Sequence, residues 1–258
     1  MNSDDVRGYI GVFDSGVGGI SILGALVHEL PSEDFVYFGD SANAPYGEKT
    51  TDEVRALSAR IVDRMIESGC KAIVIACNTA TSAAAEMLRN RYPKTPIVGV
   101  EPALKPAVLA RRHGRVLVMA TPMTVRLEKF QNLLDEWGSE AEVVSVPCVG
   151  LAARIEQGNL DAPDLTEQLQ KLIGSYANRV DAVVLGCTHY PFVQRQITSV
   201  LGDVPFFDGA IGTARQLHRR LEEEGLLKEG EEPGNVRFLS SKDDPKELEL
   251  YRSFLERI

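Results

Sequence analysis

The 258-residue sequence lacks the features that mark a membrane protein or a nucleic-acid-binding protein. No apolar run approaches the roughly 18–20 residues that cross a bilayer. Lysine and arginine form no cluster larger than a pair, and the net charge of −9 disfavours a nucleic-acid surface. The first seven residues are polar and acidic, unlike a signal or transit peptide. We therefore expect a cytoplasmic protein with no nucleic-acid and no membrane partner.

The sequence is also poor in cysteine and in nucleotide-binding motifs. Its four cysteines are too few and too scattered for a disulfide framework, so we expect reduced thiols. Residues 16–19 are rich in glycine, but Ser21 stands where a dinucleotide fingerprint needs its third glycine, and no lysine completes a phosphate loop. A Cys-x-His pair at 187–189 lacks further nearby metal ligands. We expect no cofactor and no metal.

The sequence is rich instead in short apolar runs that alternate with segments of helical period. Because these runs are continuously apolar, they predict strands covered on both faces, as in a parallel sheet with crossover helices. Thr50 and Glu53 form a capping-box pattern at the start of a helix that ends at Gly69. One further helix is predicted to run without interruption from Pro122 to Gly138. The predicted strands are 9–13, 35–38, 72–76, 97–100, 116–119, 143–146, 182–185 and 205–207.

Four of these strand segments recur in the same order at offsets of 106 to 110 residues. Segments 9–15, 37–40, 73–79 and 96–101 align with 115–121, 145–148, 183–189 and 204–209. This repeat predicts an α/β fold of two pseudo-symmetric domains, each a parallel sheet flanked by helices, with the active site in the cleft between them. The first domain would comprise 1–98 plus 209–258, and the second 99–208. The last 50 residues, with a possible strand at 236–239 and a terminal helix from Pro245, are too few for a separate core and should complete the first domain.

Two of the four cysteines occupy equivalent positions in the two repeats. Cys77 and Cys187 each follow a predicted strand, where ligands of parallel α/β sheets bind and where helix N-termini favour a thiolate. We therefore expect the pKa of Cys77 to be lowered. His189 is placed to hold or relay a proton for Cys187, and Asp14 ends the first strand, facing the same crevice.

Two equivalent thiols across one cleft suit proton transfer at a carbon atom. If one is a thiolate and the other a thiol, the pair can remove a proton from one face and deliver another to the opposite face. The product is the mirror-image stereocentre. Nothing beside Cys70 or Cys148 activates them, so we expect these two to be buried, inert thiols.

These residues lie in segments that resemble a known family. The segments are Asp-Ser-Gly-x-Gly-Gly at 14–19, Pro-Tyr-Gly at 45–47, Cys-Asn-Thr-Ala at 77–80, Ala-Thr-x-x-Thr at 120–124 and Leu-Gly-Cys-Thr-His-Tyr-Pro at 185–191. Together they resemble the bacterial glutamate racemases, within the cofactor-independent aspartate/glutamate racemase superfamily, over residues 9 to 210. The two cysteines alone would identify only the superfamily. Thr-His-Tyr-Pro together with Asp-Ser-Gly is similar to the glutamate branch.

The resemblance implies an isomerase that interconverts L- and D-glutamate and supplies D-glutamate for peptidoglycan, and hence for cell wall biogenesis and cell shape. Cys77 and Cys187 would exchange the Cα proton, assisted by Asp14 and His189 respectively. No arginine is among the implied substrate-binding residues, so we expect helix-terminal N–H groups and hydroxyls to bind the carboxylates. Glu156 lies near such sites in the family pattern, but its context here is an ordinary helix. The implied substrate-binding residues are Asp14, Ser15, Tyr46, Gly47, Asn78, Thr79, Thr121, Thr124, Thr188 and His189.

Two alternatives stay open. The protein could be another racemase of the superfamily, acting on aspartate, a hydantoin or a malonate half-ester, because the thiol pair does not distinguish these substrates. It could also be a two-lobed binding module for small anions without chemistry, since fold does not imply function. A homodimer is a further expectation, with segment 20–30 or the terminal helix as the candidate interface.

Overall fold

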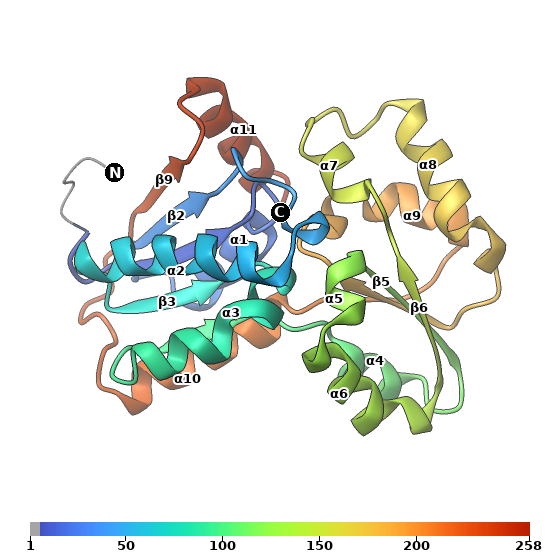
Figure 1. Cartoon of the computed structure of the whole chain (residues 1–258), viewed down its shortest axis with the longest axis horizontal. Coiled ribbons are helices and arrows are strands. Elements are labelled where there is room, and N and C mark those ends of the chain that lie inside the picture. Colours follow the sequence, from blue (N-terminus) through green and yellow to red (C-terminus); the bar gives the residue numbers. More distant parts are fainter. Residues whose placement is uncertain (1–5) are drawn as a thin grey trace.

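Two lobes lie side by side in the computed structural model of the chain, each with a central sheet flanked by helices (Figure 1). The structure describes residues 6–258, so most of the polar N-terminal segment judged unlike a signal peptide lies outside it. Every paired strand is parallel to its neighbours. The predicted α/β class with two parallel sheets is therefore confirmed. None of the described helices is long and apolar enough to cross a membrane.

The first lobe contains a five-stranded sheet in the order β4-β3-β1-β2-β9. All residues of β1, β2 and β3 are buried, which explains their continuously apolar sequences. The strands are β1 (Ile10–Asp14), β2 (Phe35–Gly39), β3 (Ala72–Ile75), β4 (Ile97–Gly99) and β9 (Val236–Ser240). The helices are α1 (Ile20–Glu29), η1 (Tyr46–Glu48), α2 (Thr51–Glu67), α3 (Asn78–Arg91), α10 (Ala210–Glu223) and α11 (Pro245–Leu255).

The second lobe contains a four-stranded sheet in the order β6-β5-β7-β8. Its strands are β5 (Arg115–Ala120), β6 (Glu142–Pro147), β7 (Ala182–Gly186) and β8 (Phe206–Phe207). Its α-helices are α4 (Leu104–Ala110), α5 (Pro122–Arg126), α6 (Glu128–Trp137), α7 (Leu151–Ile155), α8 (Pro163–Ile173) and α9 (Gln194–Leu201). Three short 3₁₀ helices complete it, namely η2 (Gly138–Glu140), η3 (Gly174–Tyr176) and η4 (Tyr190–Val193).

The two sheets have the same topology. Read from the other edge, the second sheet is β8-β7-β5-β6, which matches β4-β3-β1-β2 of the first strand for strand. The sequence repeat thus corresponds to a structural repeat. The C-terminal segment returns to the first lobe, where β9 pairs with β2 and where α10 and α11 pack on α1. The boundaries at 98/99 and 208/209 stay a prediction.

One predicted helix is wrong and one is confirmed. The capping box forms at the start of α2, where Thr50 Oγ1 accepts from Glu53 N and the Glu53 carboxylate accepts from Thr50 N. The single helix predicted from 122 to 138 is broken, because Leu127 is extended, with ψ 142°. Its side chain packs against the apolar cluster that contains Tyr46 and Met123. Packing of this partly buried leucine outweighs the local preference for one continuous helix.

Gly39, at the end of β2, packs closely against Tyr251 of the C-terminal helix α11. A Cβ atom there would lie 2.0 Å from the Tyr251 hydroxyl oxygen and 3.0 Å from the carbonyl oxygen of Gly16. Tyr251 cannot yield easily, because its hydroxyl hydrogen-bonds to Ser41 and Ser240. We expect Gly39→Ala to lower the free energy of unfolding, measured in urea, by about 1–3 kcal/mol.

The control for this variant is Gly212→Ala in α10, where an added Cβ meets nothing within 4 Å. Alanine there should leave the free energy of unfolding unchanged or raise it by up to about 1 kcal/mol, because it favours the helix. Equal stability of the two variants would show that Tyr251 does not constrain β2.

Candidate active site

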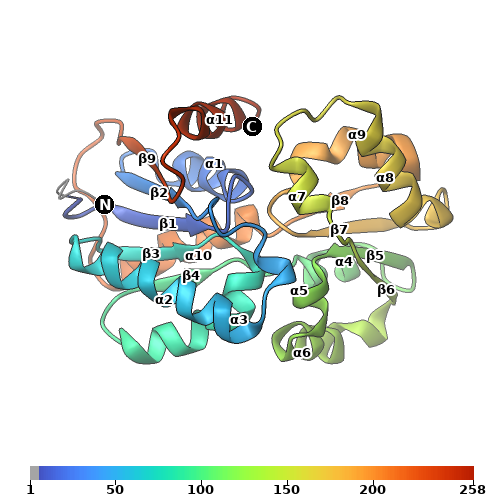
Figure 2. The same ribbon diagram turned by 45° about the horizontal axis from the view of Figure 1, so that its top comes forward.

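The two cysteines singled out by the repeat lie at the ends of equivalent strands. Cys77 follows β3 and is the N-cap of α3, where its Sγ accepts from Ala80 N at 3.4 Å. Cys187 follows β7 and precedes η4. Both side chains are buried. Figure 2 shows the carboxyl end of β1 pointing toward the second lobe, so Asp14 belongs to the same region between the lobes.

The predicted site residues converge on one small cavity between the lobes. Its volume is about 10 Å³, roughly the space of one water molecule. Asp14 and Thr124 lie just behind its wall: Asp14 accepts from Thr188 Oγ1 at 3.1 Å, and Thr124 hydrogen-bonds to Thr79 and Thr121. The lining residues are Ser15, Pro45, Tyr46, Gly47, Cys77, Asn78, Thr79, Thr121, Ala152, Cys187, Thr188 and His189.

On the first-lobe side, Ser15 stands between Cys77 and Asp14. The Cys77 thiol donates to Ser15 Oγ at 3.9 Å, and Ser15 Oγ donates to Asp14 Oδ1 at 3.5 Å. The same Oδ1 accepts from Gly16 N at 2.8 Å, which holds the carboxylate at the tip of β1. Both contacts of Ser15 are long. They trace a path along which a proton can leave the thiol.

Burial dominates the protonation of this pair. It raises the pKa of the Cys77 thiol, and the Asp14 carboxylate raises it further, while the N–H of Ala80 opposes the shift. The expected lowering of the pKa by the helix N-terminus is therefore not found, because desolvation outweighs the helix terminus. Burial also raises the pKa of Asp14 to about 6, despite the opposing charge of His189. At neutral pH this side holds a thiol beside a carboxylate.

On the second-lobe side, Cys187 faces an imidazole that is paired with a carboxylate. Cys187 Sγ lies 3.5 Å from His189 Nδ1, and His189 Nε2 hydrogen-bonds to Glu156 Oε1. Burial disfavours a charge on His189, but Cys187 and Glu156 outweigh it and raise the pKa of His189 well above its ordinary value. The two thiols thus have different ionisable partners, a carboxylate for Cys77 and an imidazole with a raised pKa for Cys187.

Glu156 makes contacts at the site that its sequence context does not indicate. It caps the C-terminus of α7, and besides His189 it accepts from Val17 N of the first lobe at 2.9 Å. An ordinary helical context gave no reason to expect these contacts, because both partners are distant in sequence. Only its place in the family pattern pointed to it.

Hydroxyl groups, rather than lysine or arginine side chains, surround the cavity. None of the residues that line it is a lysine or an arginine. Thr79 Oγ1 and Thr121 Oγ1 hydrogen-bond across the lobes at 3.0 Å, and Asn78 Oδ1 is buried without a hydrogen-bond partner. Helix N-terminal N–H groups, hydroxyls and one amide are therefore the available donors for a carboxylate ligand.

The other two cysteines differ from each other. Cys70 lies in the core of the first lobe beneath Gly11, and burial raises the pKa of its thiol. Cys148 is also buried and does not line the cavity, but its thiol interacts with the hydroxyl of Tyr190. In the described part of the chain, no three His, Cys, Asp or Glu side chains come together as metal ligands.

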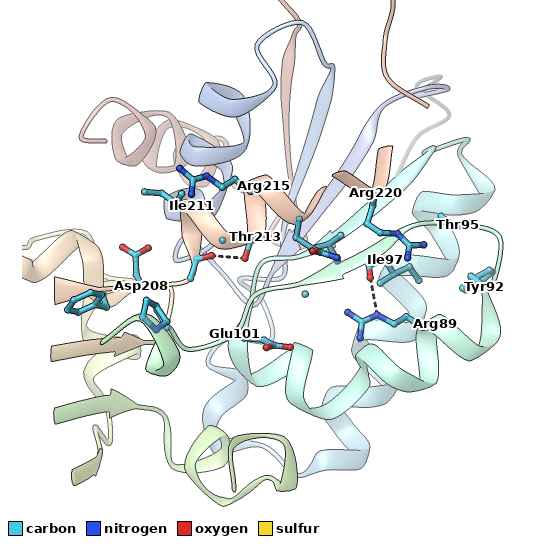
Figure 3. A pocket seen from close by; sticks show the side chains of 18 of the residues that line it. Arg89, Tyr92, Thr95, Ile97, Glu101, Asp208, Ile211, Thr213, Arg215 and Arg220 are labelled. Atoms are coloured by element: carbon cyan, nitrogen blue, oxygen red, sulfur yellow. Dashed lines mark hydrogen bonds between the residues drawn. The ribbon is translucent and has the colours of Figure 1, made fainter. Parts of the chain in front are cut away.

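A much larger groove, of about 1010 Å³, lies on another flank of the molecule (Figure 3). It is bordered by the end of α3, by β4, by β8 and by α10, and charged side chains of both signs line it, among them Arg89, Glu101, Asp208 and Arg215. It contains no thiol and none of the predicted site residues. Volume alone therefore does not locate the chemistry.

Comparisons with known proteins place the chain in a family. The model of the Asp/Glu/Hydantoin racemase family matches residues 12–217. A glutamate racemase of Clostridium acetobutylicum is 47% identical over 248 residues, which cover 96% of this chain and 97% of that protein.

Two solved structures are similar over nearly their whole length. The glutamate racemase of Francisella tularensis in complex with D-glutamate has a TM-score of 0.83 at 30% identity, covering 98% of this chain and 95% of that one. The Escherichia coli glutamate racemase in complex with L-glutamate and an activator has a TM-score of 0.85 at 28% identity, covering 97% and 95%. With its paired thiols at the ends of equivalent strands, the chain belongs to the Asp/Glu/Hydantoin racemase family.

Proposed function

We propose that this protein is a glutamate racemase that interconverts L- and D-glutamate by proton transfer between Cys77 and Cys187. The observation that supports it most is that the two cysteines line one cavity at equivalent strand ends, each with its own ionisable partner. Asp14 would assist Cys77 through Ser15, and His189 would assist Cys187. Family relatives that are 47% identical and named glutamate racemase support glutamate as the substrate.

In the L-to-D direction or its reverse, one thiolate removes the Cα proton while the opposite thiol delivers a proton to the other face. The intermediate carries an extra negative charge next to its carboxylate. N–H groups at the start of α3 and the neighbouring hydroxyls are placed to stabilise that charge as it develops. After transfer, the second sulfur is a thiolate and the first a thiol, so the reverse reaction uses the same groups in exchanged roles.

The small size of the cavity implies that the lobes separate to admit substrate. About 10 Å³ cannot hold an amino acid, and the contacts that close the cavity join the two lobes. They include polar contacts, such as those of Glu156 with Val17 and of Thr79 with Thr121, and apolar ones, such as that of Phe192 with Phe254. We infer that the polar contacts at the cavity exchange with water when the cleft opens in each turnover.

The product fits a role in supplying D-glutamate for peptidoglycan in the cytoplasm, and this role is part of the proposal. A homodimer through α1 or α11 stays a prediction. The direct test is incubation of the purified protein with L-glutamate, followed by circular dichroism. We expect the signal to decay to zero as the racemate forms. No decay would refute the proposal, and faster decay with L-aspartate would assign the site to another substrate of the family.

Glu156→Gln tests the carboxylate behind His189. Glutamine keeps an oxygen for Val17 N but removes the negative charge, so the pKa of His189 should fall. We expect kcat to decrease about tenfold, as for loss of one charged hydrogen bond, and the high-pH limb of kcat/KM to move to lower pH. The control is Glu231→Gln on the exposed loop before β9, which changes the charge equally. If kcat/KM of Glu156→Gln has the same pH dependence as that of the unchanged protein, Glu156 does not set the charge on His189.

A further inference from the structure

The side chain of Tyr190 is fully buried next to Cys187. It begins η4, and its backbone N donates to the carbonyl oxygen of Cys187 at 3.1 Å. Its hydroxyl is buried and has no hydrogen-bond partner of good geometry among the described residues. Burial of such a hydroxyl disfavours folding, and phenylalanine would fill the same space without that penalty. The hydroxyl therefore needs an explanation other than packing.

Two thiol groups, those of Cys148 and Cys187, interact electrostatically with this hydroxyl. The Cys148 thiol donates its own proton to the carbonyl oxygen of Val146 at 3.5 Å, so it remains a neutral and weak acceptor. The sulfur of Cys187 also lies 3.5 Å from Nδ1 of the His189 ring. A thiolate accepts hydrogen bonds far more strongly than a thiol, because the acceptor is ionised. Of the two sulfurs, the one that changes charge is the better partner for the hydroxyl.

The structural repeat shows what Cys187 lacks. At the equivalent position Cys77 receives a hydrogen bond from the backbone N–H of Ala80, in the first turn of α3. In the described chain no backbone N–H donates to the Cys187 sulfur. Tyr190 follows Cys187 by three residues, as Ala80 follows Cys77, but the N–H of Tyr190 bonds to the carbonyl oxygen of Cys187 instead. The second half of the site therefore has no helix-terminal donor for its thiolate.

We propose that the Tyr190 hydroxyl supplies this missing donor: it hydrogen-bonds to the Cys187 sulfur when that sulfur is a thiolate, and so stabilises and orients it. Tyr190 does not line the cavity, so it acts from behind the sulfur and does not touch substrate. It is a positioning residue, and its catalytic consequence rests on the proposed racemase function.

The ionisable groups around Cys187 come from several elements. His189 follows it in the chain, Cys148 comes from the end of β6, and Cys77 faces it across the cavity. Glu156 lies behind His189, and Asp14 reaches the same turn through Thr188. A test must therefore separate the effect of Tyr190 from the effects of these neighbours.

The test is the rate of alkylation of Cys187 by iodoacetamide as a function of pH, followed by peptide mass spectrometry. In Tyr190→Phe we expect the profile of Cys187 to move to higher pH and its alkylation at neutral pH to fall about tenfold, because the thiolate loses a charge-assisted hydrogen bond. The profile of Cys77 in the same sample should stay where it is. A Cys187 profile that coincides with that of the unchanged protein would overturn the proposal.

Two further variants keep the test decisive. Cys148→Ala should leave the Cys187 profile in place. A shift equal to that of Tyr190→Phe would show that the hydroxyl affects Cys187 only through Cys148, and would refute the proposal. Replacement of Tyr190 by 3-fluorotyrosine retains the shape and makes the hydroxyl a better donor, so the Cys187 profile should move to lower pH. The fluorotyrosine variant tests the hydrogen bond even if Tyr190→Phe impairs folding. An unshifted Cys187 profile in this variant would contradict the proposal.

Tyr92→Phe is the control for loss of a tyrosine hydroxyl, because Tyr92 bonds to Asp63 on the surface of the first lobe. It should leave both profiles unchanged. Alkylation does not require turnover, so the hydrogen bond is tested even if glutamate proves not to be the substrate. In the racemase, Tyr190→Phe should also lower kcat with little change in KM, since Tyr190 makes no contact with the cavity.

Discussion

Replacement of either cavity cysteine by serine should abolish racemisation while leaving the fold intact. A serine hydroxyl is not ionised near neutral pH, so Cys77→Ser and Cys187→Ser each lose one of the two proton-transfer groups. We expect kcat to fall by at least about 10²–10⁴-fold in both directions of the reaction. Polarimetry or circular dichroism with each enantiomer measures this loss.

Binding of glutamate should survive in both variants. The donors placed to hold the carboxylates are hydroxyls and helix N-terminal N–H groups, none of which the serine changes. Calorimetric titration should therefore give nearly the Kd of the unchanged protein. The matched control is Cys70→Ala, which removes an equally buried thiol from the core of the first lobe. It should lower stability and keep its activity, and a serine variant with full activity would refute the two-thiol assignment.

Asp14→Asn should lower the activity and remove the rise of kcat/KM on the acidic side of the pH profile. Burial raises the pKa of Asp14 to about 6, so the carboxyl is neutral below that pH and ionised above it. Only the carboxylate can accept the proton of Cys77, so kcat/KM of the unchanged protein should rise with pH through about 6. In Asp14→Asn we expect kcat to fall about 10²–10³-fold and the residual activity to show no such rise.

Asp14→Asn should lower activity but raise the free energy of unfolding at neutral pH. A carboxyl whose pKa is raised binds a proton more tightly in the folded than in the unfolded state, so the unchanged protein loses stability as pH rises from about 4 to 6. A shift of about two units corresponds to about 3 kcal/mol at most. The neutral asparagine removes this loss, and Asp14→Asn should be more stable than the unchanged protein at neutral pH. Urea titrations at two pH values measure this difference in the free energy of unfolding. In the kinetic experiment, a rise of kcat/KM through about pH 6 that persists in Asp14→Asn would assign that rise to a group other than Asp14.

The fold and the position of the thiols are predictable from the sequence for one reason. Buried parallel strands are continuously apolar, and their carboxyl ends lie together at one edge of the sheet. Cys77 and Cys187 directly follow such runs, so the sequence repeat alone indicates that their positions are equivalent. The ordered set of four matching strands likewise predicts the common topology of the two sheets.

What depends on tertiary packing was not predictable. Glu156 reaches Val17 only because the lobes meet, and no local pattern encodes that meeting. The break at Leu127 follows from an apolar cluster assembled from distant segments. The direction of the pKa shift of Cys77 depends on how deeply the thiol is buried, and burial reverses the effect that its place at a helix N-terminus suggests.

The central claim, two bases on opposite faces of one carbon, is tested most directly by isotope exchange. L-glutamate is incubated with the protein in D₂O, the reaction is stopped at low conversion, and Cα deuterium is measured separately in each enantiomer. If separate thiols remove and deliver the proton, the D-glutamate formed carries deuterium while the remaining L-glutamate still carries protium. A single base acting on both faces would return part of the original hydrogen to the product, and protium in newly formed D-glutamate would contradict the account.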